Sequence, residues 1–224
     1  MTSSHPPASA GARPPERPGD QPSPPPSATQ ALARRLILGS SSRYRRELLQ
    51  RLGLAFEVLA PDVDETPAAG EAPADLACRL ALAKARAVAA LHPGAVVIGS
   101  DQVADLDGQP LGKPGTHERA VAQLRQMRGR SVVFQTAVAV ACRDSGFEQV
   151  LLAPVRVQFR DLDDAEIEHY LRTEQPYDCA GSAKSEGLGI ALLERIDNDD
   201  PTALVGLPLI RTCALLRAAG LRIP

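Results

Sequence analysis

The chain has 224 residues, of which 44% are hydrophobic and only 3% aromatic, and its formal net charge at pH 7 is −2. This length and composition predict one substantial aliphatic core, either undivided or split by a cleft. The small negative charge gives no general attraction for nucleic acid or an anionic membrane, so any phosphate binding must come from locally placed arginines and lysines. We therefore expect neither a nucleic acid polymer nor a membrane as a partner.

The cysteine pattern and the hydropathy indicate the compartment. The four cysteines are far apart in the sequence and form no CxxC pair, which argues against a zinc site and against a disulfide framework. No apolar run approaches the ~20 residues needed to span a bilayer, and the N-terminus lacks the apolar core of a secretory signal. We expect a soluble protein of the reducing cytoplasm.

The N-terminal segment differs in composition from the rest of the chain. Residues 1–31 are rich in Pro, Ser, Ala and Gly and contain scarcely a large apolar side chain. Such a segment cannot offset the ordering entropy of ~1–2 kcal/mol per residue. We predict a disordered Pro-rich tail over residues 1–31, followed by one α/β domain in two lobes over residues 32–224. A targeting or partner signal in the tail is the alternative.

The domain is predicted to begin with a strand, a polar loop and a helix. Residues 36–38 form a short apolar run, which breaks at residues 39–42 and is followed by leucines at helical spacing up to Gly53. Residues 56–59 predict a second strand, and residues 61–67 form an acidic loop after it.

Residues 75–91 have the pattern of an amphipathic helix. Its predicted apolar stripe, with Lys84 beside it, consists of Leu76, Leu80, Ala83, Ala87 and Leu91. An apolar strand over residues 95–98 leads to Asp101, and residues 103–111 predict a hairpin that turns at an Asp-Gly pair. This hairpin would bring Lys113 back towards Asp101.

The remaining elements follow from caps, alternation and glycine stops. In chain order we predict a helix over 116–128, β-rich segments over 131–142 and 149–159, a helix opened by an Asp163/Glu166 capping box, a Gly-rich loop over 181–189, a strand over 190–196 and a helix from about Pro208.

Asp101 and Lys113 are the first candidate site residues. A carboxylate where an apolar strand ends can hold a divalent metal or take a proton from water, and a nearby lysine neutralises phosphate. The pair therefore indicates chemistry on a phosphorylated small molecule. The alternative is that Asp101 caps a turn and that Lys113 is solvated.

A second candidate group lies where the first strand passes into the first helix. Ser40, Ser42, Arg45 and Arg46 could converge on an anion together with backbone N–H groups and the positive end of the helix dipole. The segment is not a Walker A loop, because it lacks GxxxxGK[ST]. A solvated arginine face is the alternative.

Three carboxylates and one lysine complete the candidates from residue chemistry. Asp64, Glu65 and Asp101 offer the hard oxygen ligands that Mg²⁺ prefers and could bridge a metal to triphosphate oxygens. Lys84 could neutralise phosphate from its helix. Taken singly, the acidic loop and Lys84 could equally be solvated surface.

Six separated motifs together resemble the Maf family over about residues 36–220. They are Leu-Ile-Leu-Gly-Ser-Ser-Ser-x-x-Arg-Arg, Val-Asp-Glu, Ala-x-x-Lys-Ala, Ile-Gly-Ser-Asp-Gln, Gly-Lys-Pro and Val-Gly-Leu-Pro-Leu. The resemblance implies a nucleoside triphosphate pyrophosphatase that releases pyrophosphate and leaves the monophosphate. It also implies an inosine-triphosphatase-like α/β fold with a mixed central sheet flanked by helices, two lobes around a cleft, a homodimer, and use of Mg²⁺ or Mn²⁺.

The resemblance also implies residue roles. Asp101 matches the family's proton acceptor and Glu65 its acidic metal-side residue, so these two carboxylates are the implied metal ligands. Basic phosphate ligands are implied at Arg45, Lys84 and Lys113, and a loop hydroxyl near the phosphates at Ser42.

Three further positions resemble the specificity set of the branch that acts on 7-methyl-GTP: Tyr44, Gln102 and Glu186. The dTTP/UTP branch has Arg, Thr and Gln there. A cationic 7-methylguanine is attracted to an aromatic face, and a carboxylate accepts hydrogen bonds from the guanine edge. The chain departs from the family in having Arg43 for proline, and from this branch in having tyrosine for tryptophan at the aromatic position.

Two alternatives to the methylguanine prediction stay open at this stage. One is a dTTP/UTP pyrophosphatase of the sister branch. The other is a nucleotide-binding regulator of septum formation with little catalysis, a role associated with the family's name.

Overall fold

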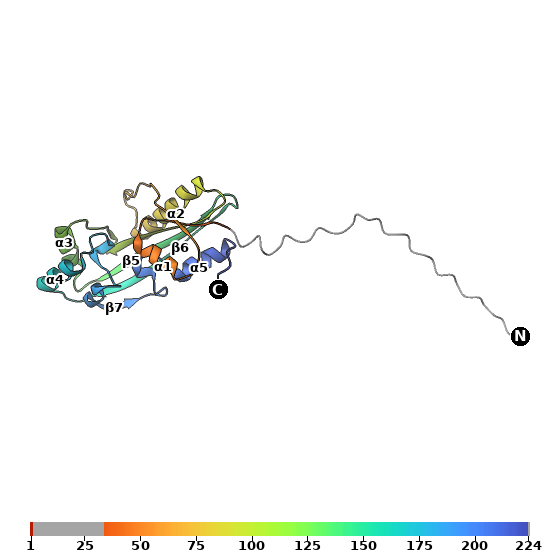
Figure 1. The fold of residues 1–224 in the computed structure, drawn as a ribbon. Coiled ribbons are helices and arrows are strands. Elements are labelled where there is room, and N and C mark those ends of the chain that lie inside the picture. Colours follow the sequence, from red (N-terminus) through yellow and green to blue (C-terminus); the bar gives the residue numbers. More distant parts are fainter. Residues whose placement is uncertain (2–33, 224) are drawn as a thin grey trace.

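The computed structural model describes Met1 and residues 34–223, so that nearly all of the predicted tail lies outside the described residues. The described strands form one seven-stranded sheet with the order β2-β1-β3-β5-β6-β7, and β4 pairs with β3 off this path. The long strands β5 and β6 run along the length of the body (Figure 1). β1 is parallel to both β2 and β3, whereas the other pairings are antiparallel. The strands are β1 Leu36–Gly39, β2 Glu57–Leu59, β3 Val96–Leu106, β4 Gln109–Leu111, β5 Ser131–Cys142, β6 Phe147–Phe159 and β7 Leu193–Asp197.

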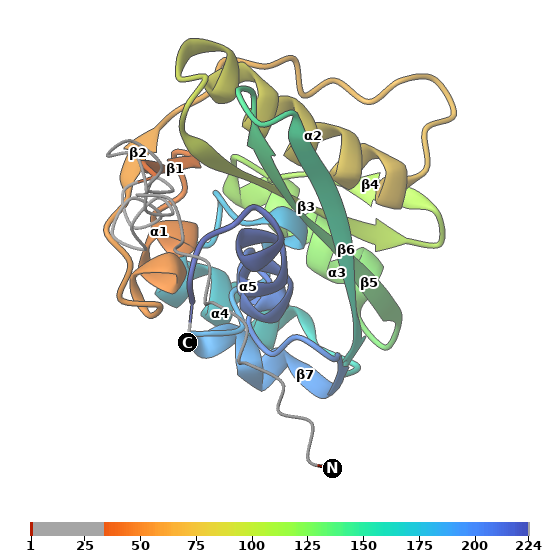
Figure 2. The ribbon, with the colours of Figure 1, turned by 90° about the vertical axis from the view of Figure 1, so that its right-hand side faces the viewer.

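Helices cover both faces of this mixed sheet. The long helix α2 packs on one face, and α1 and α5 pack on the other, so that strands β3 and β5 lie between them (Figure 2). The helices are α1 Arg43–Gln50, α2 Pro73–Leu91, α3 His117–Met127, α4 Asp164–Glu174 and α5 Leu209–Ala218, with 3-10 turns η2 Ala180–Ser182, η3 Leu188–Leu192 and η4 Ala203–Val205. Within residues 34–223, no helix combines the length and the apolar character needed to cross a membrane.

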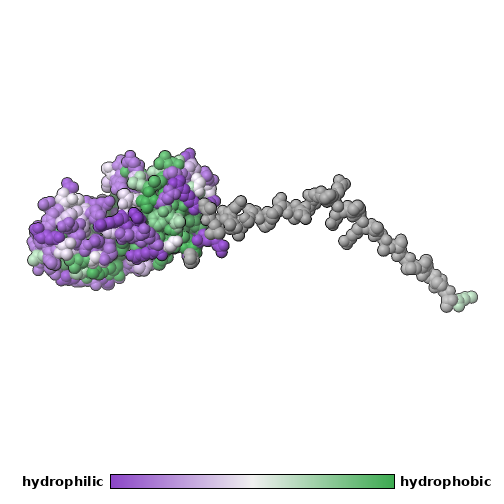
Figure 3. All heavy atoms as spheres, viewed as in Figure 1, coloured by the Kyte–Doolittle hydropathy of each residue, from purple (hydrophilic) through white to green (hydrophobic). Residues whose placement is uncertain are grey.

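The domain has two lobes that share its longest strands. One core cluster lies under α3 and α4, and two others lie on the opposite faces of the sheet under α2 and under α1 with α5. β3, β5 and β6, of 11, 12 and 13 residues, run through both lobes. Hydrophobic residues are most prominent on the surface of the α2–α5 end (Figure 3). The predicted mixed sheet, flanking helices and two lobes are confirmed.

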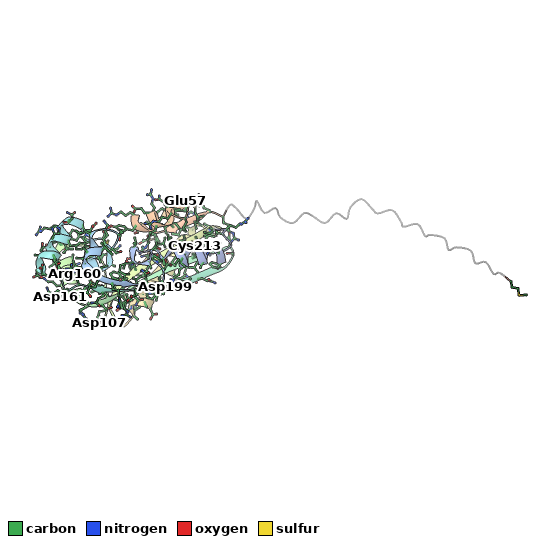
Figure 4. All side chains as sticks on the ribbon, turned by 90° about the horizontal axis from the view of Figure 1, so that it is seen from below. Glu57, Asp107, Arg160, Asp161, Asp199 and Cys213 are labelled. Carbon is green, nitrogen blue, oxygen red and sulfur yellow. The ribbon has the colours of Figure 1, made fainter. Side chains whose placement is uncertain are left out.

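Figure 4 gives the orientation of the two lobes. Asp107, at the tip of the β3–β4 hairpin, lies at the same end as Arg160 and Asp161, whereas Glu57 and Cys213 lie towards the other end (Figure 4). The strand β3 therefore runs from the α2–α5 lobe into the α3–α4 lobe, and residues in its middle lie between the two.

Most predicted caps and turns are confirmed. The Thr116 side chain accepts from the backbone N–H of Arg119 at the start of α3, and Asp163 with Glu166 forms the full capping box of α4. The β3–β4 turn has positive φ at both central residues, 53° at Asp107 and 81° at Gly108. Paired left-handed residues match the twist of a two-residue hairpin, which explains why this sequence turns there.

The predicted apolar stripe of α2 is wrong in its second half. Leu91 is 75% exposed, whereas the residues buried from the middle of the helix onwards are Ala81, Lys84, Ala85, Val88 and Ala89. The larger side chain of Leu91 shifted the predicted register. The buried face of this half consists of three alanines with Val88 and Lys84, and the helix approaches the strands closely at Gly99.

Two strand predictions also need correction. β3 does not end before Asp101 but continues to Leu106, because it pairs with β5 from Val97 to Asp105. In the C-terminal third, residues 190–192 belong to the 3-10 turn η3 and not to a strand. That turn is tied to α4, since the carboxylate of Glu174 accepts from the backbone N–H of Leu188 at 2.7 Å.

Candidate active site

An open edge in the middle of β3 defines the site. β1 pairs with β3 up to Gly99, and β4 pairs with β3 from Ala104 onwards. Residues 100–103 lie between these two pairings, so along this edge they face neither β1 nor β4. The chain leaves β1 into the serine loop at one end of the gap and leaves β4 towards Lys113 at the other. Ligands of open α/β sheets commonly bind at such carboxyl ends of parallel strands.

A pocket of about 690 Å³ lies at this edge and is lined by both lobes. Its volume lies in the range of small-molecule sites, ~300–1,000 Å³. Of the predicted site residues, all but Arg46 and Asp64 line this pocket: Ser40, Ser42, Tyr44, Arg45, Glu65, Lys84, Asp101, Gln102, Lys113 and Glu186. The distant sequence segments therefore form a single groove.

Arg46 is one of these two exceptions, and the prediction that it belongs to the anion cradle is not supported. Its side chain is exposed and is not among the described residues that line the pocket. Successive residues of an α-helix point about 100° apart. Because Arg45 faces the pocket, Arg46 is turned towards solvent.

Lys84 joins the two predicted carboxylates at the centre of the pocket. Its Nζ lies 2.6 Å from Asp101 Oδ1 and 2.6 Å from Glu65 Oε1. The side chains of Lys84 and Asp101 are only 8% and 11% exposed, whereas that of Glu65 is 56% exposed. A buried ammonium group requires such partners, because an unpaired buried charge is very costly. The solvated alternative for Lys84 is therefore wrong.

Two glycines allow Lys84 to reach this position. Gly39 and Gly99 are paired in register on β1 and β3, beneath α2. A Cβ on Gly99 would lie 2.1 Å from the carbonyl oxygen of Ala81, and one on Gly39 would lie 3.2 Å from that of Lys84. At Gly99 only glycine permits this close approach of helix to sheet, and at Gly39 a side chain would push the helix backbone away by a few tenths of an ångström. Sequence reasoning missed Gly99, although it stands two residues before the carboxylate.

The end of the pocket that is predicted to bind phosphate is built on the start of α1. Ser42 caps the helix, and Ser40 is buried beside it. The Arg45 guanidinium donates from Nε to the carbonyl of Gly206 at 2.9 Å and from Nη1 to Ser40 Oγ at 3.3 Å. Burial lowers the pKa of Arg45, and the carboxylates of Asp101 and Glu65 oppose this. A fixed cation, hydroxyl groups and a helix N-terminus together favour an anion here.

The acidic loop contributes Glu65 to the same electrostatic system. Burial alone would raise the pKa of Glu65, but its hydrogen bond to Lys84 and the positive charges of Lys84, Lys113 and Arg45 bring the pKa below 4.5. The three cations therefore act on one carboxylate. Asp64, also considered as a ligand, is exposed and accepts from the backbone N–H of Thr66 at 2.9 Å.

The other end of the pocket carries an aromatic ring and a carboxylate. Arg43 lies over the Tyr44 ring, with its Cζ 4.7 Å from the ring centroid, and its Nη2 donates to the Tyr44 hydroxyl at 2.6 Å. The Cys179 thiol donates to the same hydroxyl at 3.9 Å. Burial raises the pKa of the Cys179 thiol to about 12 and also raises the pKa of Glu186. Sequence reasoning missed Cys179 as a lining residue.

Strand alternation separates Gln102 from Asp101. Asp101 points to the α2 side of β3, whereas Gln102 points to the η4 side, as alternation along a strand requires. The Gln102 Nε2 donates to Thr136 Oγ1 at 2.8 Å and contacts the carbonyls of Ala203 and Leu204 at 3.0 Å. The amide nitrogen is therefore engaged within the protein, which leaves the Oε1 atom of Gln102 to face a ligand.

The carboxylates of the pocket suit one type of metal. Among the described residues there is no group of three or more His, Cys, Asp or Glu placed to hold a metal ion. Glu65 and Asp101 nevertheless converge on one point, now held by the Lys84 ammonium. Mg²⁺ is commonly bound by one or two carboxylates together with substrate phosphates and water. Oxygen donors without sulfur or imidazole fit Mg²⁺ or Mn²⁺.

The chain belongs to the Maf family of proteins. The model of that family, described as Maf-like protein, matches residues 35–219. A protein of Polaromonas sp. (strain JS666 / ATCC BAA-500), named 7-methyl-GTP pyrophosphatase, is 77% identical over 194 residues, which are 87% of this chain and 89% of that protein. A protein of the same name from Albidiferax ferrireducens is 71% identical and covers 87% of this chain and 98% of its own length.

Solved structures are less similar. The Ham1 protein of Staphylococcus aureus is 17% identical, with a TM-score of 0.44 over 57% of this chain and 73% of that one.

Proposed function

We propose that this protein is a nucleoside triphosphate pyrophosphatase that hydrolyses 7-methyl-GTP, and other modified nucleoside triphosphates, to the monophosphate and pyrophosphate. The observation that carries the proposal is the meeting of Asp101, Glu65 and Lys84 at the open edge of β3, between the phosphate end and the aromatic end of one pocket. The printed name of the 77% and 71% identical relatives supports the same substrate.

The proposed reaction is attack by water on the α-phosphorus. The oxygen of water forms the new bond to phosphorus, the bond to the bridging oxygen of the β-phosphate breaks, and pyrophosphate leaves with that electron pair. Asp101 accepts the proton of the water, while Lys84, Lys113 and Arg45 neutralise the charge on the transferring and leaving phosphates. Each of these residues lines the same pocket.

Mg²⁺ or Mn²⁺ is proposed as the cofactor, held by Glu65 and Asp101. When bound, such an ion withdraws electron density from phosphate oxygens and lowers the pKa of bound water. The support for this proposal is the chemistry of the two converging carboxylates, with the Lys84 ammonium as the present counter-charge.

The aromatic end of the pocket supports a methylated guanine. The Tyr44 ring offers a π face to a cationic base, an interaction of ~0.5–2 kcal/mol. Glu186 lines the same pocket, and its carboxylate can accept hydrogen bonds from the guanine edge and complement the positive base. A uracil or thymine edge would leave part of this carboxylate unpaired, at a cost of ~1–3 kcal/mol. We also propose, as family properties, a cytoplasmic location and a homodimer.

The test is a nucleotide panel with Mg²⁺ or Mn²⁺, read out as pyrophosphate release. Asp101→Asn is expected to abolish turnover while still binding a non-hydrolysable 7-methyl-GTP analogue. Asp105→Asn is the matched control, because it lies on the same strand outside the pocket and should keep the wild-type rate.

The outcomes separate the alternatives. A preference for UTP or dTTP would contradict the substrate, and nucleotide binding without pyrophosphate release would indicate a binding regulator. Wild-type rates in Asp101→Asn would remove Asp101 as the base.

A further inference from the structure

The Val-Gly-Leu-Pro-Leu motif over residues 205–209 has no role in the mechanism so far, although Gly206 lines the pocket. Gly206 is buried directly after the turn η4, and its backbone has φ 121° and ψ 2°. Its carbonyl oxygen lies 2.9 Å from Arg45 Nε and 2.9 Å from Ser100 Oγ. One backbone oxygen thus contacts both the phosphate loop and the strand that carries Asp101.

The contact fixes the direction of the Arg45 side chain. A guanidinium group has five N–H donors in one plane. The bonds to Gly206 and Ser40 use two of them, so the plane of the group is set and its other donors are left for a ligand. The fully buried Ser100, which directly precedes Asp101, adds a second contact: its single hydroxyl proton is shared between the carbonyls of Gly206 at 2.9 Å and Ala137 at 2.8 Å.

The position of the Gly206 carbonyl is itself determined by the sheet. The preceding turn η4 is fastened to β3 by Gln102 Nε2, which contacts the carbonyls of Ala203 and Leu204, and to β5 by Thr136 Oγ1, which donates to the carbonyl of Ala203 at 3.0 Å. The carbonyl is therefore held from two neighbouring strands.

The backbone conformation is what requires glycine here. A Cβ at position 206 would lie 3.7 Å from Arg45 Nε, which is ordinary van der Waals contact, so space is available. A φ of 121° is rarely adopted by residues with a Cβ. An alanine would therefore rotate the backbone and move the carbonyl away from the guanidinium.

We propose that Gly206 is a positioning residue, whose carbonyl directs the Arg45 guanidinium to the triphosphate and ties it to the strand that carries the base. The proposal rests on the proposed function for its substrate but concerns only the phosphates. It predicts that changes at Gly206 act through Arg45 and weaken every nucleotide alike.

The test compares Gly206→Ala, Arg45→Ala and the double variant. Binding of inorganic tripolyphosphate in the presence of Mg²⁺ is measured by calorimetry, and kcat/KM is measured over the nucleotide panel. Gly206→Ala should weaken tripolyphosphate binding about tenfold, because the misdirected Arg45 guanidinium would lose a well-aligned charged hydrogen bond to the phosphates. In the Arg45→Ala background it should add less than about twofold, because coupled residues are not additive.

Two controls keep the test decisive. Gly220→Ala also places alanine at a positive φ, 90°, but outside the pocket, and should bind tripolyphosphate as the wild type does. Should Gly206→Ala not fold, Ser100→Ala replaces it, with an expected weakening of about threefold that disappears in the Arg45→Ala background.

The two proposals fail in different ways. Additive effects, unchanged tripolyphosphate binding in Gly206→Ala or Ser100→Ala, or no tripolyphosphate binding by the wild type would overturn the positioning role. A changed ratio of 7-methyl-GTP to GTP turnover in Gly206→Ala would overturn it too, because Arg45 acts on phosphates and not on the base. A wild type that binds tripolyphosphate but releases no pyrophosphate would contradict only the proposed function.

Discussion

Replacing Lys84 with methionine should strongly destabilise the fold, because it leaves Asp101 buried beside no cation. At the observed 2.6 Å between Nζ and Oδ1, and an effective dielectric constant of about 20, the gross attraction is ~6 kcal/mol. Desolvation of both groups offsets part of it, and breaking such a buried pair typically costs ~3–5 kcal/mol. The contact with the exposed Glu65 adds less than about 1 kcal/mol, owing to solvent screening.

The assay is urea unfolding at pH 7, with the free energy of unfolding compared at constant m-value. We expect Lys84→Met to lose ~3–5 kcal/mol and the double variant Lys84→Met/Asp101→Asn to lose much less than the sum, because it leaves no unpaired charge. Lys113→Met is the matched control, since this lysine is exposed and should change stability by about 0.5 kcal/mol or less. A loss below about 1 kcal/mol for Lys84→Met, or an additive double variant, would contradict a stabilising buried ion pair between Lys84 and Asp101.

Three further predictions concern the acidic loop, the aromatic ring and the helix–sheet contact. The pKa of Glu65 is lowered in the folded state, so the ionised Glu65 side chain stabilises the fold above pH 4.5, and this stabilisation is lost as the pH falls through the folded-state pKa. The free energy of unfolding of Glu65→Gln, measured against pH, should therefore fall less in acid than that of the wild type. Tyr44→Trp should raise the turnover ratio of 7-methyl-GTP to GTP about two- to fivefold, since indole binds cations better, and an unchanged ratio would argue against ring stacking. Gly99→Ala should lose more than about 4 kcal/mol in thermal or urea unfolding, because its Cβ would lie 2.1 Å from a backbone oxygen, whereas Gly112→Ala has open space and should unfold like the wild type.

The local signals in the sequence predicted where elements begin and turn. Thr116, the Asp163/Glu166 box and the Asp-Gly turn at residues 107 and 108 specify their conformations through neighbours only a few residues away. Such short-range chemistry is readable without knowing the fold. For the same reason, the segments that carry the site could be placed in order along the chain.

Features that depend on distant partners could not be predicted in this way. The length of β3 follows from its pairing with β5, and the burial of Lys84 follows from the glycine pair under α2. Arg46 lies outside the pocket because of the face that α1 turns to the sheet, which the sequence of α1 alone does not specify. The hydrogen bonds of the Gln102 amide nitrogen likewise depend on the carbonyls of η4, some hundred positions later in the chain.

The continuous strands beneath the pocket limit how the molecule can move. Because β3, β5 and β6 pass unbroken from one lobe to the other, a hinge between the lobes would have to bend three strands that are hydrogen-bonded to one another. Domain closure of the kind seen in hinged enzymes is therefore disfavoured, and the charged groups on β3 are preorganised before a nucleotide arrives. The exposed segment that carries Glu65 lies at the rim and does not belong to these strands, so we expect any rearrangement on ligand binding to involve such a loop more than the sheet.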